Sequence, residues 1–74
     1  MTMKPYQERV VTEKAELDIK REKLIAFIGG ETYRTLSASE RSRLNRQLEA
    51  MALYSGILGE RIAAFALRDP GLAT

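Results

Sequence analysis

The side chains in this sequence with the clearest chemical potential are basic and aromatic groups at helical spacings. Tyr6 and Arg9 lie one helical turn apart and offer a stacking ring and a guanidinium group. Lys20 and Lys23 lie one turn apart further along, and Arg61 lies in the C-terminal half. If symmetry brings such groups together from several copies, they form a focused anion site with aromatic platforms for bases. We therefore take these five residues as candidate ligand-binding residues.

The residues that catalysis and metal binding usually need are missing from the sequence. Its 74 residues include no cysteine and no histidine, which excludes disulfides and thiolate metal sites and removes the commonest general base. No nucleophile triad, phosphate loop or metal-ligand spacing is present. Carboxylates such as Glu13 and Glu16 lie one turn from basic residues, and helix-surface pairing explains them. We expect a protein that is not an enzyme, with no catalytic residue, no metal and no cofactor.

The charge pattern favours solvated helix faces over a surface for duplex nucleic acid. Twelve Lys and Arg against ten Asp and Glu give a net charge of +2, and the two signs are interspersed. One basic cluster, diluted by Glu40 and Glu49, could begin such a surface and consists of Arg41, Arg43 and Arg46. Apolar runs such as 24–28 are too short to cross a membrane, and no signal peptide follows Met1. We expect a cytoplasmic protein.

A first long helix is predicted over residues 5–28. Pro5 suits a first helical turn, with Thr2 or Met3 preceding the helix. A heptad of apolar residues follows at Val10, Leu17 and Leu24, closed by Ile28. Two glycines at 29–30 are expected to end this helix in the left-handed cap conformation.

A second long helix is predicted over residues 38–67, after a connector over 29–37 that has room for one helical turn. Ser37 and Glu40 have the spacing of a capping box, in which each side chain accepts from the other's backbone. Asp69-Pro70-Gly71 stops the helix and leaves a tail over 68–74. The apolar seam of this helix consists of Leu44, Leu48, Met51, Leu58, Ile62 and Phe65.

Both helices carry more apolar surface than one partner can cover. A second stripe on each consists of Val11, Ala15, Ile19 and Ala26 on the first helix and of Ala50, Leu53, Ile57, Ala64 and Leu67 on the second. Burial of apolar area stabilises by about 25 cal/mol per Å², so these stripes should meet another subunit. We predict a single all-α domain over 1–74, an antiparallel two-helix hairpin that assembles into a symmetric homo-oligomer.

Two explanations are possible for the glycines in the second helix, and two for the long polar residues beside the seams. Gly56 and Gly59 lie inside the second helix, where glycine costs about 1 kcal/mol relative to alanine; they favour either a close subunit contact or room for a ligand. The row Gln47, Tyr54 and Arg61 repeats every seven residues, while Lys14 and Arg21 lie between the leucines of the first helix. These polar residues either cover the seam with their stems or build the anion site.

A family resemblance spans nearly the whole chain. Its frame comprises Tyr6–Val11, Glu13–Leu17 and Lys23–Ile28, then Gln47-Leu48, Met51, Tyr54 and Leu58–Phe65. This frame resembles the short helical-hairpin proteins of phages and prophages that include the anti-CBASS nucleotide sponges. The same hairpin domain occurs in related sponges that evade Thoeris defence.

The resemblance implies a compact homo-hexamer that binds cyclic oligonucleotides between protomers and catalyses nothing. In that family, cyclic dinucleotides use an aromatic ring near the start of the first helix and a lysine four turns later. Tyr6 matches the ring, and Lys20 matches the lysine, with Arg21 as the alternative if the register shifts by one. Arg61 matches an arginine that serves a separate cyclic trinucleotide site. Arg9 and Lys23 are candidates from charge and placement alone.

Two other functions remain open from the sequence. The chain could be a helical oligomeric adaptor for a host or phage protein, which predicts an exposed apolar groove and no effect of nucleotides on melting. Binding of duplex nucleic acid would require a continuous basic surface and a steep dependence on salt. A dimer would cover the second stripes as a hexamer would, and the preferred cyclic nucleotide cannot be read from the sequence.

Overall fold

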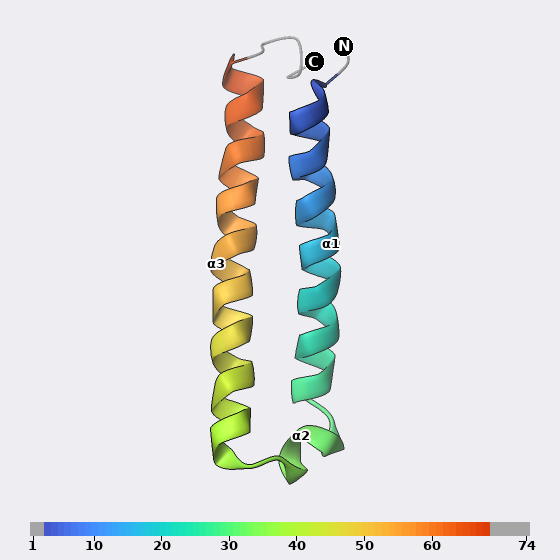
Figure 1. The fold of residues 1–74 in the computed structure, drawn as a ribbon, viewed down its shortest axis with the longest axis vertical. Helices are drawn as coiled ribbons and strands as arrows, with labels where there is room; N and C mark the ends of the chain where they lie inside the picture. The colour runs from blue at the N-terminus through green and yellow to red at the C-terminus, as the bar shows by residue number, and fades with distance from the viewer. Residues whose placement is uncertain (1–2, 69–74) are drawn as a thin grey trace.

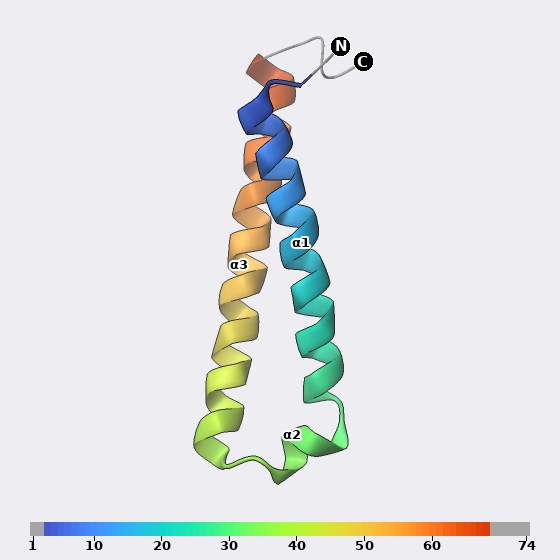
Figure 2. The same cartoon turned by 45° about the vertical axis from the view of Figure 1, so that its right-hand side comes forward.

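The computed structural model describes residues 3–68, and within them the chain forms three helices (Figure 1): α1 is Pro5–Ile28, α2 is Glu31–Thr35 and α3 is Ala38–Arg68. The all-α class is confirmed. Helices α1 and α3 lie side by side and run in opposite directions, and short α2 lies at the end where they are joined (Figures 1 and 2). The connector contains α2, a short helix in the segment where the sequence left room for one helical turn. Of the predicted tail, Arg68 belongs to α3, and 69–74 lie outside the described residues.

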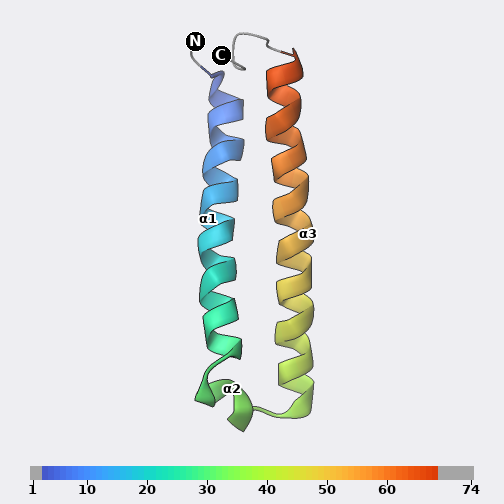
Figure 3. The same cartoon turned by 180° about the vertical axis from the view of Figure 1, so that it is seen from behind.

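The molecule is a rod, as the view from behind also shows (Figure 3). Its principal extents are 51 × 17 × 15 Å and its radius of gyration is 16.4 Å. A compact chain of this length would have a radius of gyration of about 11 Å. Two long helices side by side have only one shared seam in which to bury side chains, so the core is a single narrow row.

That row consists of the predicted heptad residues. Val10 and Leu17 of α1 pack with Leu58 and Phe65 of α3, and Leu58 is completely buried. Leu24 is also buried. Met3, Met51 and Ile62 are partly buried against this cluster. Because both helices present one apolar residue about every seven, the seam runs along the pair.

The start of α1 uses a residue that the sequence pattern did not single out. Lys4 is the capping residue, and its backbone N–H donates to the side-chain Oε1 of Gln7 at 2.9 Å. The Gln7 side chain is only 1% exposed. Pro5 occupies the first helical position, as expected, because its missing N–H has no partner there in any helix.

The end of α1 differs from the prediction of a left-handed glycine cap. Gly29 has φ −79° and ψ −3°, and no described residue has a positive φ. Its N–H donates to the carbonyl of Ile25 at 3.1 Å, so the helical path simply continues through it. Gly30 is then extended, with φ −96° and ψ 176°, and precedes α2. The chain leaves α1 through this extended residue instead of a left-handed turn.

The start of α3 confirms half of the predicted capping box. The Oγ of Ser37 accepts from the backbone N–H of Glu40 at 3.1 Å. The reciprocal half is wrong, because the carboxylate of Glu40 accepts from Nε of Arg43 at 2.8 Å instead. The guanidinium one turn along is a stronger donor for a carboxylate than a backbone N–H.

Candidate ligand-binding site

Contacts across the seam fix the level at which each residue of α1 faces α3. The rings of Tyr6 and Phe65 meet edge to face with centroids 5.7 Å apart. Further along, the Oγ of Ser55 donates to Oδ1 of Asp18 at 2.6 Å. The start of α1 is therefore level with the end of α3, and residues between these contacts can be placed by the rise of about 1.5 Å per residue.

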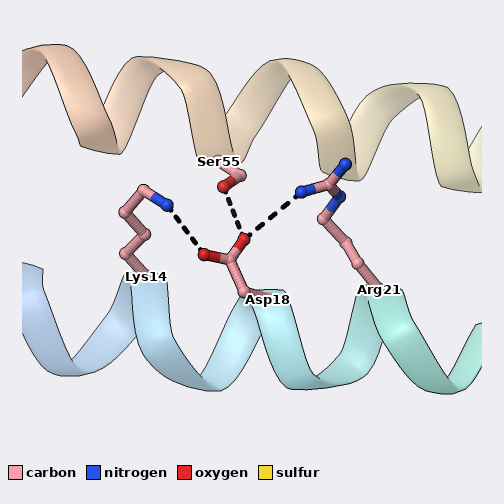
Figure 4. A network of polar contacts seen from close by, with 4 residues as sticks. All are labelled: Lys14, Asp18, Arg21 and Ser55. Atoms are coloured by element: carbon pink, nitrogen blue, oxygen red, sulfur yellow. Dashed lines mark hydrogen bonds and ion pairs between the residues drawn. The ribbon is translucent and has the colours of Figure 1, made fainter.

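One side of the seam, which we call the closed flank, carries a polar network centred on Asp18 (Figure 4). Its members are Lys14, Asp18 and Arg21 of α1 and Ser55 of α3. Nζ of Lys14 donates to Oδ2 of Asp18 at 2.7 Å, and Arg21 donates to Oδ1 at 3.4 Å. Ser55 is 3% exposed, so its hydroxyl needs this internal partner. The network ties the two helices together through side chains.

The donors of this network lower the pKa of the Asp18 carboxyl. The hydrogen bond from Lys14 is the largest cause that lowers the pKa of Asp18 from 3.8 to about 2, followed by that from Ser55. Three donors stabilise the ionised form, so Asp18 is a carboxylate at neutral pH.

Two cations that the sequence left as candidates for an anion site are paired within this network. Lys14 and Arg21 both pair with Asp18, and all three side chains are about two-thirds buried. Nε of Arg21 is buried without a hydrogen-bond partner. Sequence reasoning missed Asp18 and Ser55. The spacing of Asp18 from Lys14 and Arg21 could have found the carboxylate, but Ser55 depends on the register between helices.

The two glycines inside α3 differ in whether they pack against the closed flank. A Cβ on Gly59 would lie 3.4 Å from Cε of Lys14, so a larger residue there would crowd the lysine stem. A Cβ on Gly56 would meet nothing within 4 Å, and the residue is exposed. Packing among the described residues therefore explains a glycine at position 59 and does not explain one at position 56.

The other side of the seam, which we call the open flank, is defined by Tyr6, Lys20, Tyr54 and Arg61. At 100° per residue, Lys20 and Asp18 lie on opposite sides of the buried Leu17. Tyr54 and Ser55 likewise lie on opposite sides of the buried Leu58.

Because Asp18 and Ser55 meet on the closed flank, Lys20 and Tyr54 share the open one. Arg61 lies one heptad after Tyr54, and Tyr6 lies two heptads before Lys20, so both belong to this flank.

The cations of the open flank differ from those of the closed flank in having no ion-pair partner among the described residues. Among residues 3–68, ion pairs join Lys14 and Arg21 to Asp18 and Arg43 to Glu40. No described carboxylate pairs with the four predicted ligand-binding cations, which are all exposed: Arg9, Lys20, Lys23 and Arg61. An incoming anion can pair with such cations without displacing a described carboxylate.

Two exposed tyrosines accompany these cations. Tyr6 is 41% exposed although one edge packs against Phe65, so its ring is held in place and still accessible. Tyr54 is 43% exposed and has neither a ring contact nor a hydrogen bond among the described residues.

One chain brings the predicted site residues together only in groups. Tyr6 and Arg9 are neighbours near the start of α1, where Arg9 lines a shallow groove with Pro5, Glu8, Thr12, Glu13 and Glu16. Lys20 and Lys23 form a second group. Tyr6 and Lys20 are fourteen residues apart, about 21 Å along the helix axis. A single small ligand cannot bridge them within one chain.

The end of the rod near α2 holds a second open groove, which contains part of the predicted basic cluster. It is lined by Tyr33, Ala38, Arg41, Ser42, Asn45, Arg46 and Glu49. Nδ2 of Asn45 donates to the hydroxyl of Tyr33 at 2.8 Å. Arg43 is paired with Glu40, and Glu49 borders the groove. Arg41 and Arg46 therefore do not extend into a continuous basic surface here.

The second apolar stripes are exposed on the single chain, as their excess apolar surface predicts. On α1, Val11 is 37% and Ile19 53% exposed; on α3, Leu53 is 68% and Ile57 46% exposed. Water contacts these side chains unless another molecule covers them.

Comparison with known proteins places the chain in a family. The family model described as Sequestin matches residues 4–64, which include α1, α2 and most of α3. The chain therefore belongs to the Sequestin family, whose name agrees with the sponge resemblance in the sequence. No curated protein and no solved structure matches the chain.

Two further searches concern the described residues only. Residues 3–68 contain no helix with the length and apolar character needed to span a bilayer. They also contain no group of three or more His, Cys, Asp or Glu side chains arranged to hold a metal ion.

Proposed function

We propose that this chain is a non-catalytic sequestering protein that binds cyclic oligonucleotide second messengers at contacts between copies of itself. The observation that carries the proposal is the open flank, where cations that pair with no carboxylate of residues 3–68 share one side of the seam with two exposed tyrosine rings. Cyclic oligonucleotides carry several phosphates and several bases, which match guanidinium or ammonium groups and aromatic platforms respectively. Membership of the Sequestin family supports a sequestering role.

Two features of the single chain support the proposed assembly: the distance between its predicted ligand-binding residues and its exposed apolar surface. Tyr6 and Lys20 lie about 21 Å apart on one α1, so a pocket that uses both needs a second copy. The exposed stripes on α1 and α3 supply apolar surface for such contacts. We propose a symmetric homo-oligomer of antiparallel hairpins, a hexamer of 8.3 kDa chains in preference to a dimer.

The proposed biological role is immune evasion by a phage or prophage in the bacterial cytoplasm. A sponge without turnover must hold its ligand tightly enough to deprive the immune effector of it. Each charge-assisted contact contributes about 1.5–3 kcal/mol and each stacked base about 1–3 kcal/mol. Two symmetry-related half-sites of this kind reach the roughly 12 kcal/mol of nanomolar binding.

Thermal melting of the purified protein with a panel of nucleotides tests the proposal. The panel holds cyclic di-AMP, cyclic di-GMP, cyclic GMP–AMP and cyclic tri-AMP, with linear pApA as the control for phosphate charge. A ligand at one hundred times its Kd stabilises the native state by about 2.7 kcal/mol, which raises the Tm of a chain this small by about 10 °C or more. Arg61→Ala or Tyr6→Ala should reduce the shift to about half or less at the same ligand concentration, whereas Arg46→Ala, in the other groove, should keep it.

The alternative is a helical oligomeric adaptor that binds a host or phage protein. The exposure of Leu53 and Leu67, at 68% and 85%, favours a partner that covers apolar surface. This function predicts no shift in Tm with any cyclic nucleotide. A panel without a single shift would therefore contradict the sponge proposal and favour the adaptor.

A further inference from the structure

Tyr54 makes no stabilising side-chain contact of the kind that the other two tyrosines make in the described part of the chain. Its ring is 43% exposed, makes no ring contact and donates or accepts no hydrogen bond there. The other two tyrosines differ from it. Tyr6 packs against Phe65, and Tyr33 accepts a hydrogen bond from Asn45.

The register of the two helices places Tyr54 beside Lys20. Asp18 and Ser55 are in direct contact, at 2.6 Å. Lys20 follows Asp18 by two residues and Tyr54 precedes Ser55 by one, and both steps lead toward the α2 end because the helices run in opposite directions. At about 1.5 Å per residue, Lys20 and Tyr54 are level to within about 2 Å. Both border the same buried row on the open flank, so they face each other across the seam.

We propose that Tyr54 is a further ligand-binding residue, whose ring stacks on a base of the nucleotide whose phosphate Lys20 holds. The inference deepens the proposed function and rests on it. An ammonium group with no carboxylate partner in the described part of the chain, beside an accessible ring, matches the alternation of phosphate and base in a nucleotide. Tyr6 of one chain is too far along the rod to serve that nucleotide, so Tyr54 supplies the ring in the Lys20 half of the pocket.

Isothermal titration with the cyclic nucleotide that gives the largest melting shift tests this role. The variants are Tyr54→Phe, which keeps the ring, and Tyr54→Leu, which keeps apolar bulk without it. Tyr33→Leu is the matched control, because it removes a tyrosine ring in α2, away from the open flank. Light scattering checks that each variant keeps the wild-type mass.

Stacking predicts that Tyr54→Leu weakens binding by about 5- to 100-fold. Tyr54→Phe and Tyr33→Leu should stay within about twofold of the wild type, because neither removes a ring from the site. If the wild type binds and Tyr54→Leu binds equally well, the role of Tyr54 is overturned while the proposed function stands. If the wild type binds no member of the panel, both are overturned.

A second measurement keeps the test decisive if Tyr54→Leu alters folding or assembly. In the wild type with ¹³C-labelled tyrosine, a base stacked on the ring should move the aromatic resonances of Tyr54 upfield when the same nucleotide is added. The Tyr→Phe variants assign the three tyrosines. Saturation without a shift of the Tyr54 resonances would overturn the inference.

Discussion

The closed and open flanks border the same buried row, but they differ in whether their cations are paired with a carboxylate. On the closed flank, Asp18 gathers Lys14, Arg21 and the buried Ser55 hydroxyl into one network. On the open flank, Lys20 and Arg61 are exposed and have no ion-pair partner among the described residues. A cation already matched to a carboxylate has little to offer an incoming anion. The difference separates a flank that holds the helices in register from one suited to binding.

The largest expected effect lies at the seam that the two flanks share. Leu58 is fully buried, so Leu58→Ala should lower the free energy of unfolding by about 2–5 kcal/mol. Urea denaturation followed by circular dichroism measures this loss. Ile25→Ala, at a position that is 51% exposed and outside the second stripes, is the control. A Leu58→Ala variant as stable as the wild type would contradict the seam as the core.

The next effect concerns the open flank and should appear in binding rather than in stability. Arg61→Ala should weaken binding of the active cyclic nucleotide by about 10- to 100-fold, because it removes a charge-assisted contact. Its free energy of unfolding should change by no more than about 0.5 kcal/mol, since the side chain has no ion-pair partner among residues 3–68 to lose. Titration calorimetry and urea denaturation of the same variant separate the two quantities. A large loss of stability with unchanged affinity would reverse the assignment of the flanks.

The opposite pattern is expected for the closed flank. Asp18→Asn should lower the Tm, because Lys14 and Arg21 lose their anion, while the Kd should stay within about twofold of wild type. The stabilisation by Asp18 should also depend on pH. The pKa is lowered from 3.8 to about 2, so on acidification the unfolded chain is protonated first.

The difference in Tm between wild type and Asp18→Asn should therefore be constant above about pH 5. It should shrink as the pH falls through 4 toward 2. Melting curves from pH 2 to 7 measure it, and a difference that grew on acidification would contradict the network.

The smallest effect would sharpen the electrostatic account of the open flank. Glu13 lies at the level of Arg61 across the seam, since Lys14 and Gly59 are close neighbours. No ion pair joins Glu13 to Arg61, but its charge should repel an anionic ligand. Glu13→Gln should strengthen binding by about two- to fivefold. Glu22→Gln makes the same charge change away from this flank and should leave affinity unchanged; equal gains in both variants would show a non-specific effect of net charge.

Much of the fold follows from short-range patterns that a sequence displays. The heptad of Val10, Leu17 and Leu24 indicates the buried row, and Ser37 accepts the backbone bond that its position before a helix predicts. The left-handed cap at Gly29 was wrong because glycine permits that conformation without requiring it. The carboxylate of Glu40 accepts from the guanidinium of Arg43 one turn along instead of from the backbone N–H of the cap. Spacing alone does not decide between these two donors.

The candidate site was less predictable, because it depends on which side of the seam each side chain lies. Lys14 and Lys20 look equivalent in sequence, as long cations beside a row of leucines. The ion pair of Lys14 with Asp18 and the contact between Asp18 and Ser55 distinguish them, by assigning Lys14 to the closed flank and Lys20 to the open one. The roles of Tyr6, Arg9, Lys20, Lys23 and Arg61 in binding remain predictions, since they require contacts between copies that one chain does not contain.

The central claim is that the open flank binds the cyclic nucleotide and the closed flank does not. The most direct measurement is a crystal structure of the protein with the cyclic nucleotide that shifts its melting. The account predicts a ligand between copies, with phosphates within hydrogen-bonding distance of Lys20 or Arg61 and a base against Tyr6 or Tyr54. A ligand bound at Lys14 and Arg21, with Asp18 displaced from them, would contradict it.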